Sequence, residues 1–319
     1  MSDSTKTHRI DMVATAACLG ALCCWSIGPI FIKSLTAYAD SWTQNMLRYA
    51  VACLFWLPYL IHMMAKGEFA QRTWRRAILP SIANITMQSL WAAGFYYLGA
   101  AFLTLLSKTS IFWVAGFSLL FFPSERPLVR SYRFWLGFAL ALVGLFGVLF
   151  FKEGFTVAGA QIGIVIALVT AFMWAVYTIS VKIALRDIDS RSAFSVISIY
   201  TAIGLSVCGF LFGDPGQALK LTPWAWGMVI VSAITAIALG HVLFYAAIKR
   251  IGATIPMLVI LTQPFAVFSL SRIIFHERLS GVQLVFGMLL LVGAALSIWA
   301  QQHLPALSSR ERVADARSR

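Results

Sequence analysis

The sequence has few charged residues, and none of its acidic residues falls within a long apolar segment. Charged residues make up 12% of the 319 residues, whereas 60% are hydrophobic. A soluble domain of this length could not keep that much apolar surface in solution, so we predict a membrane protein. Without a buried carboxylate to carry a proton or hold a lipophilic cation, exchange of protons for cationic drugs is disfavoured.

Sequence features that mark other functional classes are also missing. The five cysteines all lie in predicted membrane segments, so neither a disulfide framework nor a metal site is expected. Glycine-rich phosphate loops, metal-ligand clusters and catalytic triads are absent, and we therefore predict no enzymatic activity, no cofactor and no metal. The net charge of +13 does not predict nucleic-acid binding, because the basic residues lie in short loops beside apolar segments.

The long apolar stretches predict the architecture. Each could cross about 30 Å of hydrocarbon as a helix of roughly 20 residues, and none has the alternating pattern of a barrel strand. We therefore predict an all-α integral membrane protein with ten transmembrane helices. The stretches are residues 12–33, 43–65, 77–98, 100–121, 134–151, 158–183, 192–212, 222–248, 253–274 and 281–300.

The basic residues predict the orientation in the membrane. With the N-terminus inside, 18 of the 25 basic residues flank the helices on the cytoplasmic side and four flank them on the other side. By the positive-inside rule, both termini of this multi-pass protein of the cell (inner) membrane are expected in the cytoplasm. Residues 1–11 would form the cytoplasmic N-terminus, and residues 301–319 a polar, disordered cytoplasmic tail.

An internal repeat divides the chain into two halves, residues 12–151 and 158–300. Trp25 precedes Lys33 by eight residues, and the same pair recurs 149 positions later. Because each half holds five spans, the second half enters the membrane from the opposite side. Inverted repeats around a central cavity are a recurring design of carriers that open alternately to each side. The recurring elements are Trp25 and Lys33 with Trp174 and Lys182, Phe95-Tyr96 with Phe244-Tyr245, Leu142-Val143-Gly144 with Leu291-Val292-Gly293, and, 152 positions apart, Glu125-Arg126 with Glu277-Arg278.

Ionisable residues within a membrane are costly and are therefore functional candidates. Lys108 lies eight residues into its span, about 12 Å deep at the rise of an α-helix, and is the first candidate for substrate binding. A lysine that reaches a loop or a backbone carbonyl is the alternative. Arg48 and Arg272 lie within reach of the membrane surface and are candidates for gating or for an interface. A buried ammonium would pair with a carboxylate or phosphate, which favours an anionic or zwitterionic solute.

Polar and aromatic residues with helical spacing extend the candidate site. Asn84, Gln88 and Trp91 share one helical face, and Trp174 and Tyr177 form a similar face on the sixth span. Hydrogen bonding between helices is the alternative role for these faces. Further substrate-binding candidates are Trp25, Trp113 and Gln263, and further candidates for gating or an interface are Gly28, Pro29, His241 and Pro264.

The prolines and the histidine have specific expectations. Gly28-Pro29 in the first span and Pro264 in the ninth remove helix hydrogen bonds, so they can free carbonyl groups toward a cavity or act as hinges. For His241, a hydrogen-bonded core histidine is favoured over a proton carrier.

These features resemble the drug/metabolite transporter superfamily, EamA type, over residues 12–300. The resemblance rests on the two five-span halves and on the recurring Trp-to-Lys, Phe-Tyr and Glu-Arg elements. It implies a basket of helices around a central cavity, alternating access, and in most members the export of amino acids or other small metabolites. The matching residues, which it implies are architectural, are Trp25, Lys33, Trp174, Lys182, Glu125 and Glu277.

We therefore predict a secondary transporter that exports a small anionic or zwitterionic metabolite, such as an amino acid. Its predicted partners are this small-molecule substrate and the lipid bilayer, without nucleic acid. Transport of nucleotide-linked sugars or phosphorylated metabolites is one alternative, and a non-transporting membrane enzyme or accessory protein is another. The coupling ion is left open, as is a homodimer.

Overall fold

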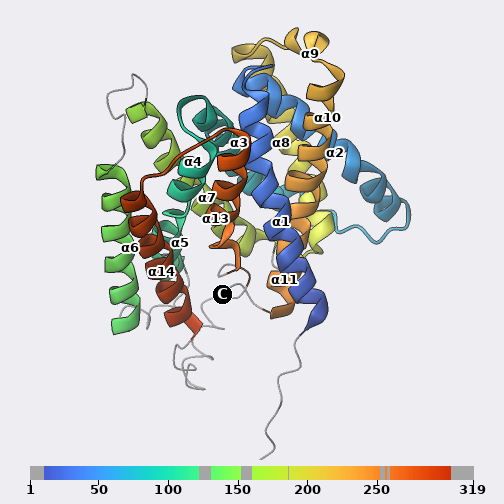
Figure 1. Cartoon of the computed structure of the whole chain (residues 1–319). Coiled ribbons are helices and arrows are strands. Elements are labelled where there is room, and N and C mark those ends of the chain that lie inside the picture. Colours follow the sequence, from blue (N-terminus) through green and yellow to red (C-terminus); the bar gives the residue numbers. More distant parts are fainter. Residues whose placement is uncertain are drawn as a thin grey trace, which may run out of the picture.

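The computed structural model describes residues 11–121, 131–151, 160–185, 187–251, 256 and 259–302, and over these residues it is helical, without a strand. The helices pack as one bundle, in which α1 begins and α14 ends at the same end, at the bottom of Figure 1. Residues 1–10 of the expected N-terminus, almost all of the tail 301–319 and the Glu125-Arg126 pair lie outside the described residues.

The helices follow the two expected halves of the chain. Those of the first half are α1 (Met12–Leu35), α2 (Ser41–Ala65), α3 (Arg72–Tyr97), α4 (Ala100–Ser107), α5 (Ser110–Phe121) and α6 (Tyr132–Phe150). Those of the second half are α7 (Ala160–Ala184), α8 (Ser190–Phe212), α9 (Gln217–Lys220), α10 (Pro223–Ser232), the π-helix η2 (Ala233–Leu239), α11 (Gly240–Ile251), α13 (Gln263–Ile274) and α14 (Gly281–Gln302).

Most of the expected spans are apolar helices in the structure. Within the described residues, six segments are long and apolar enough to cross a membrane: Met12–Leu35, Ser41–Ala65, Ala100–Phe121, Gln161–Ala184, Ser190–Phe212 and Pro223–Ala247. Two shorter apolar helices are Tyr132–Val148 and Gly281–Ser297. The expected span 77–98 lies in α3, a helix that also carries polar residues, and 253–274 is described only in part. The all-helical membrane fold is confirmed, and the number of ten spans stays a prediction.

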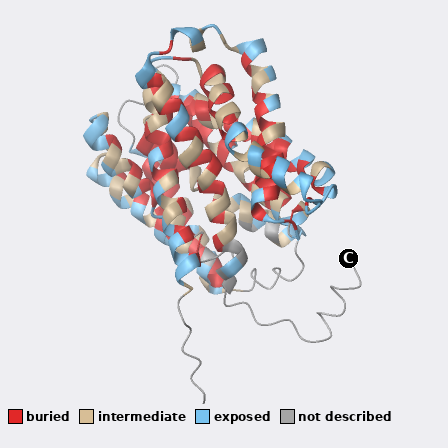
Figure 2. Ribbon diagram, turned by 90° about the vertical axis from the view of Figure 1, so that its right-hand side faces the viewer, coloured by how far each residue is buried: buried red, intermediate tan, exposed pale blue. Residues whose placement is uncertain are grey.

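Large apolar side chains cover the outer faces of the bundle. Leu54, Phe150 and Phe210 are 64%, 82% and 70% exposed, whereas buried residues gather along its middle (Figure 2). Such a surface is unfavourable in water and favourable against lipid chains. The burial pattern is therefore that of a bundle whose outer faces meet lipid.

The two halves interlock through equivalent helices. The first helix of each half packs against the third span of the other, α1 on η2 and α11, and α7 on α3. Other contacts join counterparts directly: α2 with α8, α4 with α13, and α6 with α14. This reciprocal pattern means that neither half forms the bundle alone.

Two repeat-related aspartates show that α2 and α8 run antiparallel. Asp40 caps the start of α2 and accepts a hydrogen bond of 3.0 Å from the N–H of Asp214, just beyond the end of α8. Asp189, 149 positions after Asp40, caps the start of α8 and accepts one of 3.2 Å from the hydroxyl of Tyr59, near the end of α2. Counterpart helices that run in opposite directions are the geometry of an inverted repeat.

The Asp40 carboxylate lies outside the spans and is held ionised. Burial alone would raise its pKa, but the hydrogen bonds from Thr43, Asp214 and Trp42 outweigh burial and hold the pKa below its usual value. A lowered carboxyl pKa stabilises the fold above the unfolded pKa, and that contribution is lost as the pH falls through the folded pKa.

Two spans are interrupted at corresponding places. α4 ends at Ser107 and α5 begins at Ser110, with a turn at Lys108 and Thr109, and a second turn at residues 261–262 precedes α13. The expected span 100–121 is therefore an apolar segment that contains a turn, not one regular helix. The hydroxyl of Thr109 donates to the Leu106 carbonyl at 2.8 Å and so competes for a backbone acceptor of α4.

Glycines allow the backbones of α6 and α14 to meet. A Cβ atom on Gly293 would lie 2.3 Å from the backbone nitrogen of Ala141, and one on Gly144 would lie 2.3 Å from that of Leu290. Small residues that permit such approach are the usual means of helix association in lipid, because no hydrophobic effect operates there.

Gly293→Ala should therefore destabilise the protein, because its methyl group meets backbone atoms that cannot rotate away. We expect a loss of about 1–3 kcal/mol, seen as a lower temperature of thermal unfolding in detergent. Gly227→Ala on α10 is the matched control, since a Cβ there meets no atom within 4 Å. Equal unfolding temperatures for the two variants would contradict the close packing of α6 on α14.

Candidate functional site

Lys108 lies where the two interrupted spans meet. Its Nζ atom donates to Oε1 of Gln263, the first residue of α13, at 2.6 Å. The Nε2 atom of Gln263 donates to the backbone carbonyl of Trp25 at 2.7 Å. These two hydrogen bonds join the turn after α4, the start of α13 and the middle of α1, so three of the predicted substrate-binding residues come together.

Pro29 explains why the Trp25 carbonyl is free to accept that bond. In an α-helix the carbonyl of residue 25 would pair with the N–H of residue 29, and proline has no N–H. Pro29 lies inside α1 and is buried. The first span thus contains a carbonyl without its helical donor, and Gln263 supplies the missing donor.

The charge of Lys108 is not neutralised by a carboxylate among the described residues. The ion pairs seen there join residues at the ends of helices, such as Arg76 with Asp187 and Arg250 with Asp11. Gln263 is a neutral acceptor and occupies one of the three N–H groups of the ammonium. The N-terminal, positive end of α13 lies at Gln263 and adds to the local positive potential. This arrangement can hold an anionic group.

The repeat-related tryptophans Trp25 and Trp174 contact each other. Their ring centroids are 5.7 Å apart with an edge-to-face angle of 85°, and Phe244 lies 4.8 Å from Trp25. Because the two tryptophans occupy equivalent positions in the two halves, their contact lies at the interface between the repeats. Both predicted residues thus belong to one cluster, next to the hydrogen-bonded group of Lys108.

The π-helix η2 interrupts the eighth span, for which the sequence predicts a continuous helix over 222–248. π-helical turns are rare and frequently occur at functional sites. Three successive carbonyls of η2 accept hydrogen bonds of 3.0 Å from ring nitrogens: Ala236 from Trp25, Ile237 from His241 and Ala238 from Trp56. Side chains from three helices therefore stabilise the irregular backbone.

His241 lies among the aromatic residues and is 3% exposed. Its Nδ1 faces the Ile237 carbonyl, which can only accept, so Nδ1 carries the hydrogen. Its Nε2 has no hydrogen-bond partner. Nearby, the hydroxyl groups of Tyr177 and Tyr245 form a hydrogen bond with each other. The sequence-based preference for a hydrogen-bonded core histidine describes Nδ1 but leaves Nε2 unexplained.

Arg48 does not reach the membrane surface, contrary to the sequence-based interpretation. Its side chain is 2% exposed, its Nε donates to the Ser232 hydroxyl at 3.0 Å, and its Nη1 has no partner. The interpretation was wrong because distance along the helix does not reveal that α8 and η2 cover this face of α2. Arg48 is therefore a second cation of the first half inside the bundle, and it is more deeply buried than Lys108.

Asn84 takes part in hydrogen bonding between helices, the alternative considered for its face of α3. Its Nδ2 lies 3.0 Å from the Thr201 hydroxyl and 3.3 Å from that of Tyr49. The backbone carbonyl of Gln88 accepts from Asn45 at 2.6 Å. Trp91 contacts Phe95 on its own helix at 4.9 Å. This face of α3 joins α2 and α8, without a described hydrogen bond to the Lys108 group.

The other four candidates lie apart from one another. Trp113 is 46% exposed and contacts Phe172 of α7 at 5.0 Å. Arg272 is exposed in the last turn of α13, as expected for a residue near the membrane surface. Pro264 is the second residue of α13, just after the turn. Gly28 lies against η2, where an added Cβ would be 2.9 Å from that of Ala236.

Comparison with known families now identifies the fold. The family model described as "EamA-like transporter family" matches residues 12–150 and 161–299, most of the chain. The chain belongs to the EamA-like transporter family. The two matches begin 149 residues apart, at 12 and 161, the separation at which Trp25 and Trp174 recur.

Comparison of structures agrees on the fold of this EamA-like transporter. A solved structure titled "Crystal structure of protein" superposes with a TM-score of 0.62 at 17% identity, over 91% of this chain and 99% of that one. At this identity the likeness shows the fold alone. No curated protein matches the sequence.

The recurring Lys and Glu of this EamA-like chain satisfy the backbone at the α3–α4 turn. Lys33 donates to the carbonyl of Phe95 at 2.7 Å, at the end of α3. Glu277, from the second half, accepts from the N–H groups of Ala100 and Ala101 at 2.7 and 3.1 Å, at the start of α4. Gly99 makes room for that carboxylate, since a Cβ would lie 2.7 Å from it. These contacts are architectural, as expected.

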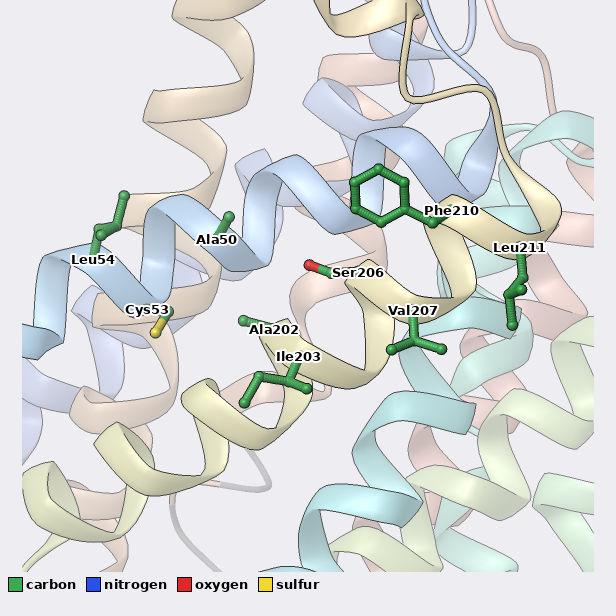
Figure 3. A pocket seen from close by; sticks show the side chains of 9 residues that line it. All are labelled: Ala50, Cys53, Leu54, Ala202, Ile203, Ser206, Val207, Phe210 and Leu211. Carbon is green, nitrogen blue, oxygen red and sulfur yellow. The ribbon is translucent and has the colours of Figure 1, made fainter.

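A groove of about 650 Å³ lies between α2 and α8 on the outer side of the EamA-like bundle (Figure 3). Ser206 contributes the single hydroxyl among the residues that line it, and none of them is charged. The lining residues are Ala50, Cys53, Leu54, Ala202, Ile203, Ser206, Val207, Phe210 and Leu211. This groove offers no partner to an anionic solute and is separate from the Lys108 site.

Sequence reasoning missed several residues that hold the site. Trp56 donates a hydrogen bond to η2, and Ser232 accepts one from Arg48. Phe194 stacks on His241, with ring centroids 5.0 Å apart. No repeat signal marks Trp56, because the residue 149 positions later is Leu205. The repeated aspartates Asp40 and Asp189, by contrast, carry a signal that the same offset could have revealed.

Glu277→Ala should destabilise the EamA-like fold, because it leaves two N–H groups at the start of α4 without their charged acceptor. We expect a loss of about 1–3 kcal/mol, measured by thermal unfolding in detergent. Glu68→Ala, at an exposed turn, is the control and should unfold like the wild type. A Glu277→Ala protein with unchanged stability would show that water or other groups replace the carboxylate.

Proposed function

We propose that this EamA-like transporter is a secondary carrier that exports a small anionic or zwitterionic metabolite, such as an amino acid. The observation that carries the proposal is the Lys108 ammonium, which lies without a carboxylate partner among the described residues, at the meeting point of two interrupted spans. Broken helices near the midplane are where many secondary transporters bind their substrates. The solute's own carboxylate would supply the missing negative charge.

Alternating access is supported by the way in which the halves meet. The central contacts, Trp25 with Trp174 and Lys108 with Gln263, cross between the repeats. A rocking motion of one half against the other would change these contacts first. The bound solute would then lie between the moving parts and be exposed to each side in turn.

The proposed topology has ten spans, both termini in the cytoplasm and the cell inner membrane as its location. The described ion pairs support this orientation, because they gather at the end of the bundle where α1 begins. Asp11 pairs with Arg250 there, and Asp187 pairs with Arg72 and Arg76 between the start of α3 and the end of α7. This is the basic end of the molecule.

A phosphorylated metabolite or nucleotide-linked sugar is a second candidate substrate, and Arg48 favours it. Its guanidinium is buried, with Nη1 unpartnered. A solute with two negative charges would suit a carrier with two cations inside its bundle, Arg48 and the partly buried Lys108. Competition by phosphate esters, and not by amino acids, would select this alternative.

Replacing Lys108 with Met should remove substrate binding with little loss of folded protein. The change deletes a charge-assisted hydrogen bond of roughly 1.5–3 kcal/mol, equivalent to about 10- to 150-fold in affinity. The measurement is the rise in unfolding temperature of purified protein with amino acids, other carboxylates and phosphate esters. It is followed by efflux of the stabilising solute from proteoliposomes.

Lys220→Met is the matched control, because Lys220 is exposed on the short helix α9. We expect this control to keep both the stabilisation and the efflux. Equal binding and efflux by Lys108→Met and the wild type would remove Lys108 from the substrate site. A wild-type protein that moves no solute of the panel would count against the transport function itself.

A further inference from the structure

The groove between α2 and α8 is hollow because its floor is made of small side chains. The floor residues are buried or half-buried, whereas those of the rim are each more than half exposed. The floor is Ala50, Cys53, Ala202 and Ser206, and the rim is Leu54, Ile203, Val207, Phe210 and Leu211. α2 belongs to the first half of the chain and α8 to the second (Figure 3). An occupant of the groove therefore contacts both halves.

The groove covers about half of the thickness of a membrane. On α8 its lining runs from Ala202, in the middle of the helix, to Leu211, one residue before its end. That length of helix spans about 13 Å, close to half of the roughly 30 Å of hydrocarbon in a bilayer. The lining residues of α2 lie near the middle of that helix. The groove thus has the length of one leaflet, and one of its ends lies at the membrane surface.

A transmembrane helix of a partner protein does not fit this groove, because such a helix crosses the whole hydrocarbon layer with roughly 20 residues. Toward the other end of α2, Tyr59 reaches across to α8. Its hydroxyl donates to Asp189 at 3.2 Å, and its ring centroid lies 4.9 Å from the guanidinium carbon of Arg191. Helices in lipid associate through close backbone contacts, and the large rim side chains keep a second helix away from the small floor residues.

An extended acyl chain meets both requirements of the groove. It is as long as one leaflet, and it has no polar group to satisfy. None of the lining residues is charged, and the Ser206 hydroxyl is the single polar side chain among them. The volume of about 650 Å³ lies within the range of roughly 300–1,000 Å³ of sites that hold small ligands.

The end of the groove at the membrane surface carries negative charge. The connections that meet there, between α1 and α2 and between α8 and α10, contain two acids, Asp40 and Asp214, and one base, Lys220. The Asp40 carboxylate accepts a hydrogen bond of 3.0 Å from the N–H of Asp214 and so joins the two connections. Asp214 is exposed, its Oδ1 accepts from the Gly216 N–H, and its Oδ2 has no hydrogen-bond partner among the described residues. This free carboxylate oxygen attracts a positively charged head group.

An aromatic pair marks the level of the lipid head groups beside this end. Trp42, in the first turn of α2, and Phe212, the last residue of α8, have ring centroids 5.4 Å apart. Tryptophan is enriched where the hydrocarbon of a membrane meets the head groups. A chain that enters the groove beside this pair therefore brings its head group to the level of Asp214.

We propose that the groove binds one acyl chain of a phospholipid with a primary ammonium head group, of the phosphatidylethanolamine class. The chain lies on the floor residues between the two halves, and the ammonium donates a hydrogen bond to the Asp214 carboxylate. An anionic head group, such as that of phosphatidylglycerol, meets like charge at this end and binds less well. The site lies on the outside of the bundle and is independent of the proposed function. Its occupant links the repeats and stabilises their contact.

The first test measures lipid binding to the purified wild-type protein after removal of copurified lipid. Palmitoyl-oleoyl phosphatidylethanolamine and the corresponding phosphatidylglycerol are added in detergent micelles at equal mole fractions. A ligand of the folded state stabilises that state, so the ethanolamine lipid should raise the unfolding temperature more. Native mass spectrometry should show one retained ethanolamine lipid per protein, preferred about two- to fivefold, as expected for an exposed ion pair. Equal retention of the two lipids, or a preference for phosphatidylglycerol, would overturn the proposed head group.

A photoactivatable phosphatidylethanolamine locates the site without any substitution. The reagent carries a diazirine in the middle of one acyl chain. Crosslinked peptides should contain residues 50–54 of α2 and 202–211 of α8. Crosslinks spread evenly over other exposed apolar faces, such as those around Phe150 and Ile273, would overturn the groove as a specific site.

Substitutions test the groove and the carboxylate separately. Ser206→Phe fills the groove, and Thr86→Phe is the matched control, because Thr86 is exposed on α3 and does not line the groove. Ser206→Phe should lose the retained lipid and the stabilisation by it, whereas Thr86→Phe should keep both. Asp214→Asn should still retain a lipid but bind the two lipids equally. Retention of the ethanolamine lipid by Ser206→Phe contradicts the proposal, and if this variant does not fold, the crosslinking map decides.

The oligomeric state separates a lipid from a second copy of this chain. Light scattering in detergent should give the same protein mass for the wild type and Ser206→Phe. A wild-type dimer that becomes a monomer in Ser206→Phe, together with a wild type that retains no lipid, would show that a second copy occupies the groove and would overturn the proposal.

Discussion

The hydrogen bond between Gln263 and the Trp25 carbonyl is the interaction on which the centre of this protein depends. Pro29 deprives that carbonyl of its helical donor, and in hydrocarbon an unpaired backbone group costs several kcal/mol. Gln263 can satisfy it only because α13 begins at this depth, and the same side chain then accepts from Lys108. The donor that Pro29 removes from α1 is thus replaced by a side chain at the start of α13. The same side chain binds the Lys108 ammonium.

The same constraint governs the rest of the irregular backbone. The carbonyls of η2 are bound by ring nitrogens of α1, α2 and α11, and the ends of α3 and α4 are bound by Lys33 and Glu277. The two repeats share the same helix arrangement, and the site arises where equivalent positions of the two repeats carry different residues. Residue 178, the counterpart of Pro29, is a threonine with its own N–H, so α7 keeps the backbone donor that α1 lacks. An irregular segment is tolerated only where a partner helix brings a donor or acceptor to it.

Much of this frame could be predicted from the sequence, because its causes are local. Apolar length predicted the spans, and the 149-residue offset predicted the two halves and the Trp25 and Trp174 pair. Other features depend on contacts between distant residues and leave no local pattern. The burial of Arg48 depends on α8 and η2. The turn at Lys108 lies within an apolar stretch whose sequence predicts a single helix. The π-helix depends on hydrogen bonds from Trp25 and Trp56. Proline chemistry gave the freed carbonyl at Trp25 but not the identity of its new donor.

The distribution of charge is the basis for the proposal that the solute itself completes the centre. Lys108 and Arg48 lie inside the described bundle without a carboxylate partner, and the described acidic residues stay near the helix ends. A buried cation without a counter-ion is unfavourable, so an anionic group that enters gains from every cation already present. A lysine–carboxylate pair of the protein's own would neutralise the site and compete with the solute. The lack of acidic residues in the spans therefore supports the proposed function, in which the cargo supplies the negative charge.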